Sequence, residues 1–295
     1  MLSSEQILTG IKSDNRSGAS TLYNHILTYT RCYLDELSDA KEDKQEALLK
    51  SLPARVQSAK LEMAPFVNLA SQLRKRIGDV NINPKILQSL ITFVTDLEKK
   101  HEDSTRNIAL NTEPFIPNDA RIVTISMSST VLAVFQHHPA PETLTVIVPE
   151  SRPECEGVDF TVKLDKIGVH TEIIADFAVE KYASECDIFL CGADAVTENY
   201  LVNKIGTGLI ALLVNSAGGK CISVFDESKI VSSADFAFNP HEYSPDELTT
   251  VSLRNGRISN YYFESVDLTR FTHFITETGP KSLSEIKQMV EHISC

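Results

Sequence analysis

The segment at residues 192–207 contains the residue types best suited to chemistry in this chain. Asp194 follows an apolar run of strand length at residues 187–191, and Asn203 and Lys204 stand just before a Gly-Thr pair that begins a buried helical pattern. In open α/β sheets, ligands bind beyond the carboxyl ends of the strands. A helix N-terminus with free N–H groups beside a lysine suits a phosphate. The segment therefore predicts a site for a small phosphorylated molecule, with one carboxylate available for proton transfer.

Polar residues follow other expected strands, and each allows two interpretations. Ser128 and Ser129 lie in the hydroxyl-rich segment 126–130, which either donates hydrogen bonds to a phosphate or caps the next helix. Arg152 either binds a phosphate through paired N–H donors or forms a surface ion pair with a neighbouring glutamate. Asp176 either contacts a ligand hydroxyl or caps the helix that follows it.

A loop near the N-terminus, residues 14–20, is a further candidate for the same site. It contains Arg16 and leads into the first long helical pattern. The loop therefore offers either a second anion-binding helix N-terminus or an ordinary capped helix start. The sequence leaves both interpretations open.

The secondary structure that must position these residues is predicted to change along the chain, from helices alone to alternating strands and helices. Between residues 21 and 108 apolar residues recur at helical spacing on three faces, and Asn83 is a candidate N-cap for the third. The segment 111–119 contains two prolines and predicts a linker. Beyond it, short apolar runs alternate with helical patterns, which is typical of βαβ crossovers and a parallel sheet.

We therefore expect an α/β protein with an N-terminal all-α helical domain over residues 1–112 and a Rossmann-like parallel-sheet domain over residues 119–295. In the second domain we expect strands at residues 121–126, 143–148, 170–175, 187–190, 221–225 and 271–276, and helices at residues 131–137, 160–167, 205–214 and about 282–293.

The composition excludes several classes of function. The 28 Lys and Arg residues against 40 Asp and Glu give a net charge of -12, which argues against a general nucleic-acid or membrane-surface binder. No apolar run reaches the length of a membrane span. The six scattered cysteines predict reduced, buried thiols and a cytoplasmic location. The histidines lack metal-ligand spacing with the cysteines, so neither a metal site nor a cofactor is predicted.

Several ordered motifs together resemble one family. It contains the α, β and δ regulatory subunits of translation initiation factor 2B, ribose-1,5-bisphosphate isomerase and 5-methylthioribose-1-phosphate isomerase. The resemblance covers nearly the whole chain and implies a helical N-terminal domain before a Rossmann-like one. The matching segments are residues 192–196, 202–207 and 150–157, with further matches at 17–19, 226–229, 262–264 and 275–279.

The resemblance implies a role for each matching residue. In the isomerases the aspartate of the Gly-Ala-Asp segment is catalytic, and here it is Asp194. Their second catalytic residue is a cysteine after the first strand, and Ser126 stands at that position in this sequence. The residues implied to bind phosphate or line the site are Arg16, Gly18, Ala19, Arg152, Asn203 and Lys204.

The serine matters because isomerisation of an aldose 1-phosphate needs assisted ring opening and proton transfer. A thiol, with a pKa of about 8.5, exchanges a proton near neutral pH, whereas a serine hydroxyl needs an adjacent base. The expected function is a sugar-phosphate or nucleotide-phosphate binding protein of the regulatory-subunit type. The alternative is an aldose-ketose isomerase with altered chemistry. The resemblance also implies a homodimer through the Rossmann-like half and translation-factor partners.

Overall fold

The helical part of the chain follows from its apolar periodicity. The computed structural model describes residues 2–39, 41–78 and 84–293. The three predicted helical faces belong to α2, α4 and α5, whereas α1 and α3 were not predicted as separate helices. Asn83, the predicted N-cap, lies outside the described residues. The helices are α1 (Ser4–Ser13), α2 (Ala19–Ser38), α3 (Glu42–Gln57), α4 (Ala64–Ile77) and α5 (Pro84–Thr112).

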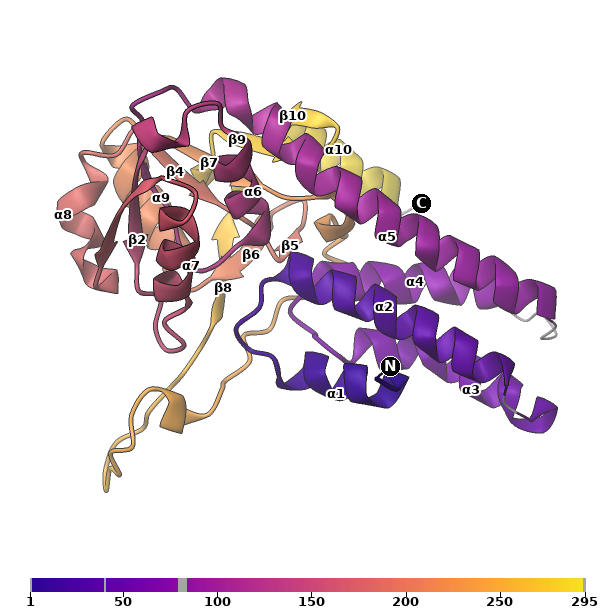
Figure 1. The fold of residues 1–295 in the computed structure, drawn as a ribbon. Coiled ribbons are helices and arrows are strands. Elements are labelled where there is room, and N and C mark those ends of the chain that lie inside the picture. The colour runs from indigo at the N-terminus through magenta and orange to yellow at the C-terminus, as the bar shows by residue number, and fades with distance from the viewer. Residues whose placement is uncertain (1, 40, 79–83, 294–295) are drawn as a thin grey trace.

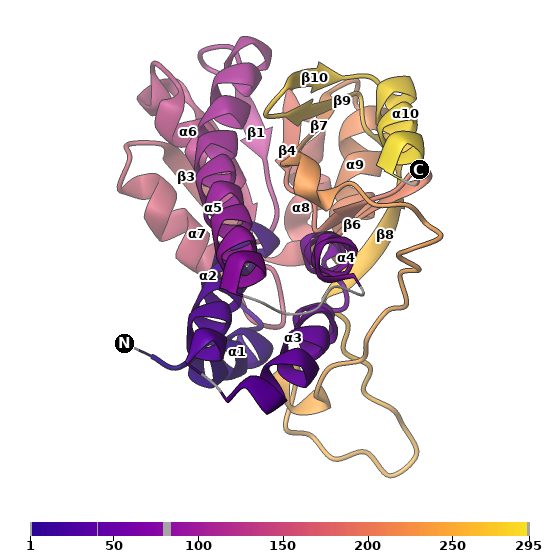
Figure 2. The ribbon, with the colours of Figure 1, turned by 90° about the vertical axis from the view of Figure 1, so that its right-hand side faces the viewer.

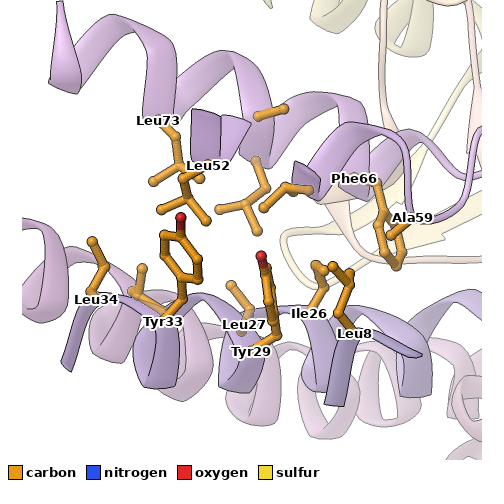
Figure 3. Packing of buried hydrophobic residues seen from close by; sticks show 14 of the residues in the cluster. Leu8, Ile26, Leu27, Tyr29, Tyr33, Leu34, Leu52, Ala59, Phe66 and Leu73 are labelled. Atoms are coloured by element: carbon orange, nitrogen blue, oxygen red, sulfur yellow. The ribbon is translucent and has the colours of Figure 1, made fainter. Parts of the chain in front are cut away.

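These helices bury their apolar faces against one another. Tyr29 and Tyr33 of α2 lie among leucines of α2, α3 and α4 in the resulting core (Figure 3). Figure 1 shows α5 running from the outer end of this helical half to the sheet half.

The helix α5 is longer than the sequence predicts, because it continues to Thr112, inside the expected linker. Its last turns pack in the core of the sheet half through Ile108 and Ala109. The Asn111 side-chain amide also donates hydrogen bonds to the carbonyls of Thr276, at 3.0 Å, and Glu277, at 3.2 Å. One helix therefore belongs to both cores.

The sheet half is a Rossmann-like layer of seven strands with helices on both faces (Figure 2). All its neighbouring strands are parallel except β10, which is antiparallel to β9. The order β10-β9-β7-β4-β1-β2-β3 confirms the predicted parallel sheet. The strands are β1 (Arg121–Val123), β2 (Thr145–Pro149), β3 (His170–Ile174), β4 (Ile188–Cys191), β7 (Lys220–Val224), β9 (His273–Thr276) and β10 (Gly279–Lys281).

Successive strand residues point to opposite faces, so each face of the sheet has its own core. Ile122 of β1 packs with α6 and α7, whereas its neighbour Val123 packs with α8, α9 and α10. The helices are α6 (Ser129–His137), α7 (Glu156–Asp165), α8 (Val179–Ala183), α9 (Thr207–Ser216) and α10 (Leu283–Ile293), and 3₁₀ turns lie at Glu113–Phe115, Pro141–Thr143, Asp176–Ala178, Glu227–Lys229, Pro245–Glu247 and Leu268–Arg270.

A second, antiparallel sheet was not predicted from the sequence. It consists of β5 (Ala195–Val196), β6 (Tyr200–Lys204) and β8 (Phe263–Asp267). The strand β6 lies directly before the helix predicted at residues 205–214, where no strand was predicted. It pairs with β8, about sixty residues further along the chain, so local periodicity could not reveal it.

Between β7 and β8 the chain makes a long excursion, part of which projects away from the rest of the molecule in both views (Figures 1 and 2). It is held by a bridge between Glu242 and Tyr261. Over the described residues, no helix combines the length and apolarity needed to cross a membrane.

Candidate functional site

A cavity lies where three helix N-termini meet the carboxyl ends of β1 and β4. We call it the front cavity, and its volume is about 50 Å³. The starts of α2, α6 and α7 surround it. It is lined by residues 15–20, Met63, residues 125–129, Glu156, residues 192–194, Asn203, Lys204, Lys229, Tyr262 and Phe263.

The front cavity brings together nine of the ten residues predicted for the site. Those nine are Arg16, Gly18, Ala19, Ser126, Ser128, Ser129, Asp194, Asn203 and Lys204. Arg152 does not line it. The fold therefore joins a loop near residue 16 to strand ends more than a hundred residues away.

Asp194 is almost completely buried, with 7% of its surface exposed. Burial raises the pKa of Asp194 to about 6, although the ammonium of Lys229, the Ala19 amide and Lys204 act in the opposite direction. A carboxyl group with this pKa can release or accept a proton near neutral pH. This is the strongest chemical property of the site.

Lys204 is held in a buried ion pair. Its Nζ lies 2.8 Å from Oε1 of Glu156, and both side chains are 5% exposed. The same Nζ lies 4.9 Å from the centre of the Tyr262 ring, which is a cation–π contact. The Oε2 atom of Glu156 is buried without a hydrogen-bond partner among the described residues. Glu156 therefore has unused acceptor capacity at the wall of the cavity.

Ser126 is fixed by the same glutamate. Its hydroxyl donates to Glu156 Oε1 at 2.6 Å, and its backbone N–H donates to Ser151 Oγ at 2.9 Å. Its φ of 61° places it in the left-handed region, which turns the chain from β1 toward α6. The base beside the hydroxyl is a carboxylate already paired with Lys204. A carboxylate is a weak base for a serine hydroxyl, so Ser126 is a poor proton donor here.

The start of α2 supplies backbone donors to the cavity. Gly18 is its N-cap, its first turn carries no acidic residue, and no described side chain caps it. A side chain at Gly18 would place its Cβ 3.1 Å from the Met127 carbonyl oxygen, so glycine allows this close approach. One first-turn amide, that of Ala19, donates to Asp194. The remaining amides of this turn suit an anion.

The start of α6 is different, because its own side chain caps it. Ser128 Oγ accepts a hydrogen bond from the Val131 N–H at 3.3 Å. The capping interpretation is therefore correct for Ser128, although Ser128 and Ser129 also line the cavity.

Arg16 lines the cavity but is already engaged. Its Nη2 donates to the Glu154 carbonyl at 3.1 Å and lies 3.1 Å from Asp159 Oδ2. Its side chain is 53% exposed. A phosphate would compete with these acidic partners for the guanidinium.

Arg152 and Asp176 belong to a different hollow. The Arg152 guanidinium donates to the Leu248 carbonyl at 2.9 Å and lines a hollow beside Phe177 and Ile205. The carboxylate of Asp176 accepts the N–H groups of Ser151, at 2.7 Å, and Arg152, at 2.8 Å. Asp176 thus fixes the loop after β2, which neither of its two predicted roles anticipated.

The prediction that the start of α9 binds phosphate is wrong. The N–H groups of Gly206 and Gly208 both donate to Oε1 of Glu264, each at 2.9 Å. The carboxylate from β8 therefore occupies the place that a phosphate would take. Asn203 faces the same turn, where its amide donates to Thr207 Oγ1 at 3.0 Å.

Among the cavity-wall residues that the sequence reasoning missed, three hold or carry its charges: Glu156, Lys229 and Tyr262. Lys229 is 2% exposed, and its Nζ lies 3.9 Å from Asp226 Oδ2. Glu156 and Tyr262 hold Lys204 as described above. All three lie inside segments that match the family, at 150–157, 226–229 and 262–264, but their side-chain contacts had no local signal. In the described ranges, no group of three or more His, Cys, Asp or Glu is placed to hold a metal ion.

Comparisons with known proteins agree with this architecture. A relative from Pyrococcus abyssi, a putative translation initiation factor eIF-2B subunit 2-like protein, is 24% identical over 279 residues, covering 93% of this chain and 94% of the relative. The ribose 1,5-bisphosphate isomerase of Archaeoglobus fulgidus is 25% identical over 287 residues, covering 91% and 86%. The crystal structure of a translation initiation factor eIF-2B from Pyrococcus horikoshii aligns with a TM-score of 0.78 and 26% identity, covering 94% of this chain and 96% of that one.

A family-wide comparison reaches the same result. The model of the initiation factor 2 subunit family matches residues 9–281, which span both halves of the fold and every segment around the front cavity. The protein therefore belongs to the initiation factor 2 subunit family.

Proposed function

We propose that the front cavity binds a phosphorylated sugar or nucleotide and that the protein acts as a ligand-binding regulatory subunit. One observation carries the proposal: an uncapped helix start faces a cavity walled by two buried lysines, Lys204 and Lys229. The α2 amides and the lysines would hold the phosphate. Asp194 and Asn203 would accept or donate hydrogen bonds to the hydroxyl groups of the sugar.

The state of Ser126 favours binding over the isomerase reaction. Its hydroxyl donates to a carboxylate that is itself paired with Lys204, so it lacks a base able to activate it. The site would thus hold a sugar phosphate with only Asp194 able to exchange a proton. One such group supports recognition, whereas the hydrogen transfer also needs a second acid or base.

The alternative function, an aldose-ketose isomerase, is favoured by one observation. The pKa of Asp194 is raised to about 6 by burial, which suits general acid–base catalysis near neutral pH. A relative in the comparison carries the name ribose 1,5-bisphosphate isomerase. In this case Glu156, close to Ser126, would take the place of the missing thiol.

Ligand binding is tested by calorimetry with ribose 1,5-bisphosphate, 5-methylthioribose 1-phosphate and a nucleoside monophosphate. The wild type should bind at least one of them and gain thermal stability through linkage. The double variant Lys204→Gln/Glu156→Gln should lose this binding, because it removes the lysine without leaving a buried charge. Lys220→Gln is the matched control, since Lys220 lies exposed at the opposite end of the sheet. No binding of any of the three compounds by the wild type would refute the proposal.

Turnover is tested by NMR of a bound aldose 1-phosphate. We expect the wild type to leave the sugar unchanged and Ser126→Cys to gain some ketose formation. Ketose formation by the wild type that is lost in Asp194→Asn would instead establish the isomerase.

We also infer that the chain forms a homodimer through its sheet half. Phe177 is 88% exposed and lines one hollow with the exposed Ile205 and Leu209, and the exposed Leu212 lies one turn further along α9. Exposed apolar patches of this kind mark interfaces. Light scattering should give a dimer for the wild type and a monomer for Phe177→Asp/Leu209→Asp. Leu110→Asp, at an exposed leucine of α5, is the control and should remain dimeric.

A further inference from the structure

A second cavity lies behind the front cavity, between the helices and the sheet half. We call it the back cavity, and its volume is about 300 Å³. Its walls come from α2, α4 and α5 on one side and from the 3₁₀ turn Glu227–Lys229 and the β9–β10 turn on the other. The ligand binding proposed for the front cavity does not use the back cavity.

The helices face the back cavity with polar rows where a helical bundle would ordinarily carry apolar ones. The row on α4 contains Ser71, Gln72 and Lys75, and the row on α5 contains Lys100 and Ser104. Their spacing of three or four residues places each row on one face of its helix. Packing between these helices needs no such polar groups.

The helix side of the cavity carries unpaired positive charge. Lys75 and Lys100 form no ion pair with the described residues. The carboxylates, in contrast, have partners within the chain. Those of Asp226, Glu227 and Glu277 accept from the Ser228 N–H, the Thr278 hydroxyl and the Glu227 N–H respectively.

Burial also raises the pKa of Glu277. The carboxylates on the sheet side of the cavity thus have hydrogen-bond partners within the chain, whereas the two lysines on the helix side have no ion-pair partner among the described residues. The two unpaired lysines on the helix side therefore suit an anionic group.

His101 lies in the wall of the back cavity, and 9% of its surface is exposed. Its Nε2 is 3.0 Å from the Ser20 carbonyl oxygen, which can only accept, so Nε2 carries the proton. The edge-to-face contact with Tyr23, at 5.1 Å between ring centres, fixes the ring. Its Nδ1 is buried without a partner among the described residues. Because Nε2 carries the proton, Nδ1 is an acceptor, and a buried acceptor without a partner is costly; the hydroxyl of a singly protonated phosphate is a donor that would satisfy it.

Two contacts join the back cavity to the front cavity. Ser20 lines the front cavity, and its hydroxyl lies 3.1 Å from Nε2 of His101. Lys229 also lines the front cavity, and its ammonium lies 3.9 Å from the Asp226 carboxylate, which lines the back one. The two cavities therefore share a wall of buried polar groups.

We propose that the back cavity binds a small phosphorylated metabolite and that its occupancy changes the front cavity through Ser20–His101 and Asp226–Lys229. The phosphate group lies between Lys75 and Lys100 at the mouth. The proposal is independent of what the front cavity binds.

The test is an NMR titration of the full chain with inorganic phosphate at constant ionic strength, following the imidazole signals assigned with His101→Gln. The His101 signal should shift with saturation in the wild type. In Lys75→Gln/Lys100→Gln the apparent affinity should fall roughly tenfold or more, since two charge-assisted contacts are lost. Lys85→Gln is the matched control, an exposed lysine at the far end of α5, and should titrate like the wild type.

A second variant separates the back cavity from the front one. In Lys204→Gln/Glu156→Gln, whose front cavity lacks its lysine, the His101 shift should persist, and the amides of residues 19 and 20 should shift with the same midpoint. A His101 signal that phosphate leaves unchanged would overturn the proposal, as would equal affinity in the Lys75→Gln/Lys100→Gln variant. Loss of sugar-phosphate binding to the front cavity, with the His101 shift retained, would refute the proposed function and leave this inference standing.

Discussion

At the residue scale, the site contains fewer buried cations than buried carboxylates, and this imbalance sets the pKa of its carboxyl groups. Lys204 neutralises Glu156 at 2.8 Å, whereas Lys229 stands between Asp226 and Asp194. Asp194 has no close ion-pair partner among the described residues, so burial prevails and its pKa rises to about 6. A bound phosphate would add negative charge to this set and raise the proton affinity of Asp194 further.

The pH dependence of stability should reveal Asp194. Its pKa is raised to about 6 from 3.8, so the folded state holds this proton more tightly than the unfolded chain. Its contribution is therefore present at low pH and is lost as the pH rises from about 4 to about 6. In Asp194→Asn this loss is absent. Urea unfolding should show the variant gaining on the order of 1–3 kcal/mol relative to wild type between pH 4 and 7.5. A difference that stays constant over this range would contradict the assignment.

The buried Lys204–Glu156 pair should behave as a unit. Lys204→Gln leaves the Glu156 carboxylate buried without its cation, which should cost about 3–5 kcal/mol of unfolding free energy. Adding Glu156→Gln should restore most of that loss, because the neutral amide can still accept from Ser126. Chemical denaturation of the two variants measures the difference. If the double variant is no more stable than the single one, the pair is not coupled.

At the element scale, the positions of the helices depend on close backbone approach and on helix caps. Gly157, in the first turn of α7, lies against the end of β2, where an added Cβ would be 2.0 Å from the Pro149 carbonyl oxygen. Glu264 of β8 accepts two amides at the start of α9 and so joins the small sheet to this helix.

Two glycines on helices should respond in opposite directions to the same substitution. Gly157→Ala should destabilise the protein by about 3 kcal/mol, because the clash is with backbone that cannot move aside. Gly10→Ala, inside α1 with nothing within 4 Å of the new Cβ, should stabilise it by about 0.5–1 kcal/mol. Thermal unfolding of both variants measures this. Similar changes in the two would show that α7 is not held by this contact.

The cap of α9 should be separable from the ligand site. Glu264→Ala removes the acceptor of two helix amides and should cost about 1–2 kcal/mol of stability. Glu264→Gln keeps an acceptor oxygen and should lose less. Because Glu264 does not line the front cavity, sugar-phosphate affinity in calorimetry should remain close to that of the wild type. A large loss of affinity would place the start of α9 back in the phosphate site.

At the scale of the whole molecule, α5 connects the two halves. Leu87, Leu90 and Val94 pack in the helical core, whereas Ile108 and Ala109 pack in the core of the sheet half. The expected boundary between residues 112 and 119 therefore follows a helix whose last turns belong to the second core. Both cavities lie where the two halves meet.

We expect the two halves to unfold together. Urea unfolding followed by far-ultraviolet circular dichroism, which reports mainly on the helices, and by tyrosine fluorescence should give coincident transitions. A fragment of residues 119–295 lacks the last turns of α5 and should unfold at lower urea concentration than the full chain. Two separate transitions in the full chain would mean that the halves are independent.

The sequence by itself determined the class of fold and predicted most of the residues that line the front cavity. The alternation of short apolar runs with helical patterns required a parallel sheet, and the strand ends at Asp194 and Ser126 followed from it. These signals are local, since they depend on periods of two and 3.6 residues and on turn chemistry. Gly18 and Ala19 lie in the loop 14–20 that the sequence offers as an anion site, but their individual roles came only from resemblance to a family.

The tertiary structure decided which charges meet. In the folded chain, Glu264 accepts the amides at the start of α9, and Arg152 lies outside the front cavity. Glu156 and Lys229, which were not predicted for the site, line it. It also paired β6 with β8 and built the back cavity from three helices and two turns. These contacts join residues tens to hundreds of positions apart. They are fixed by packing and by the need to satisfy buried polar groups, which no local pattern in the sequence records.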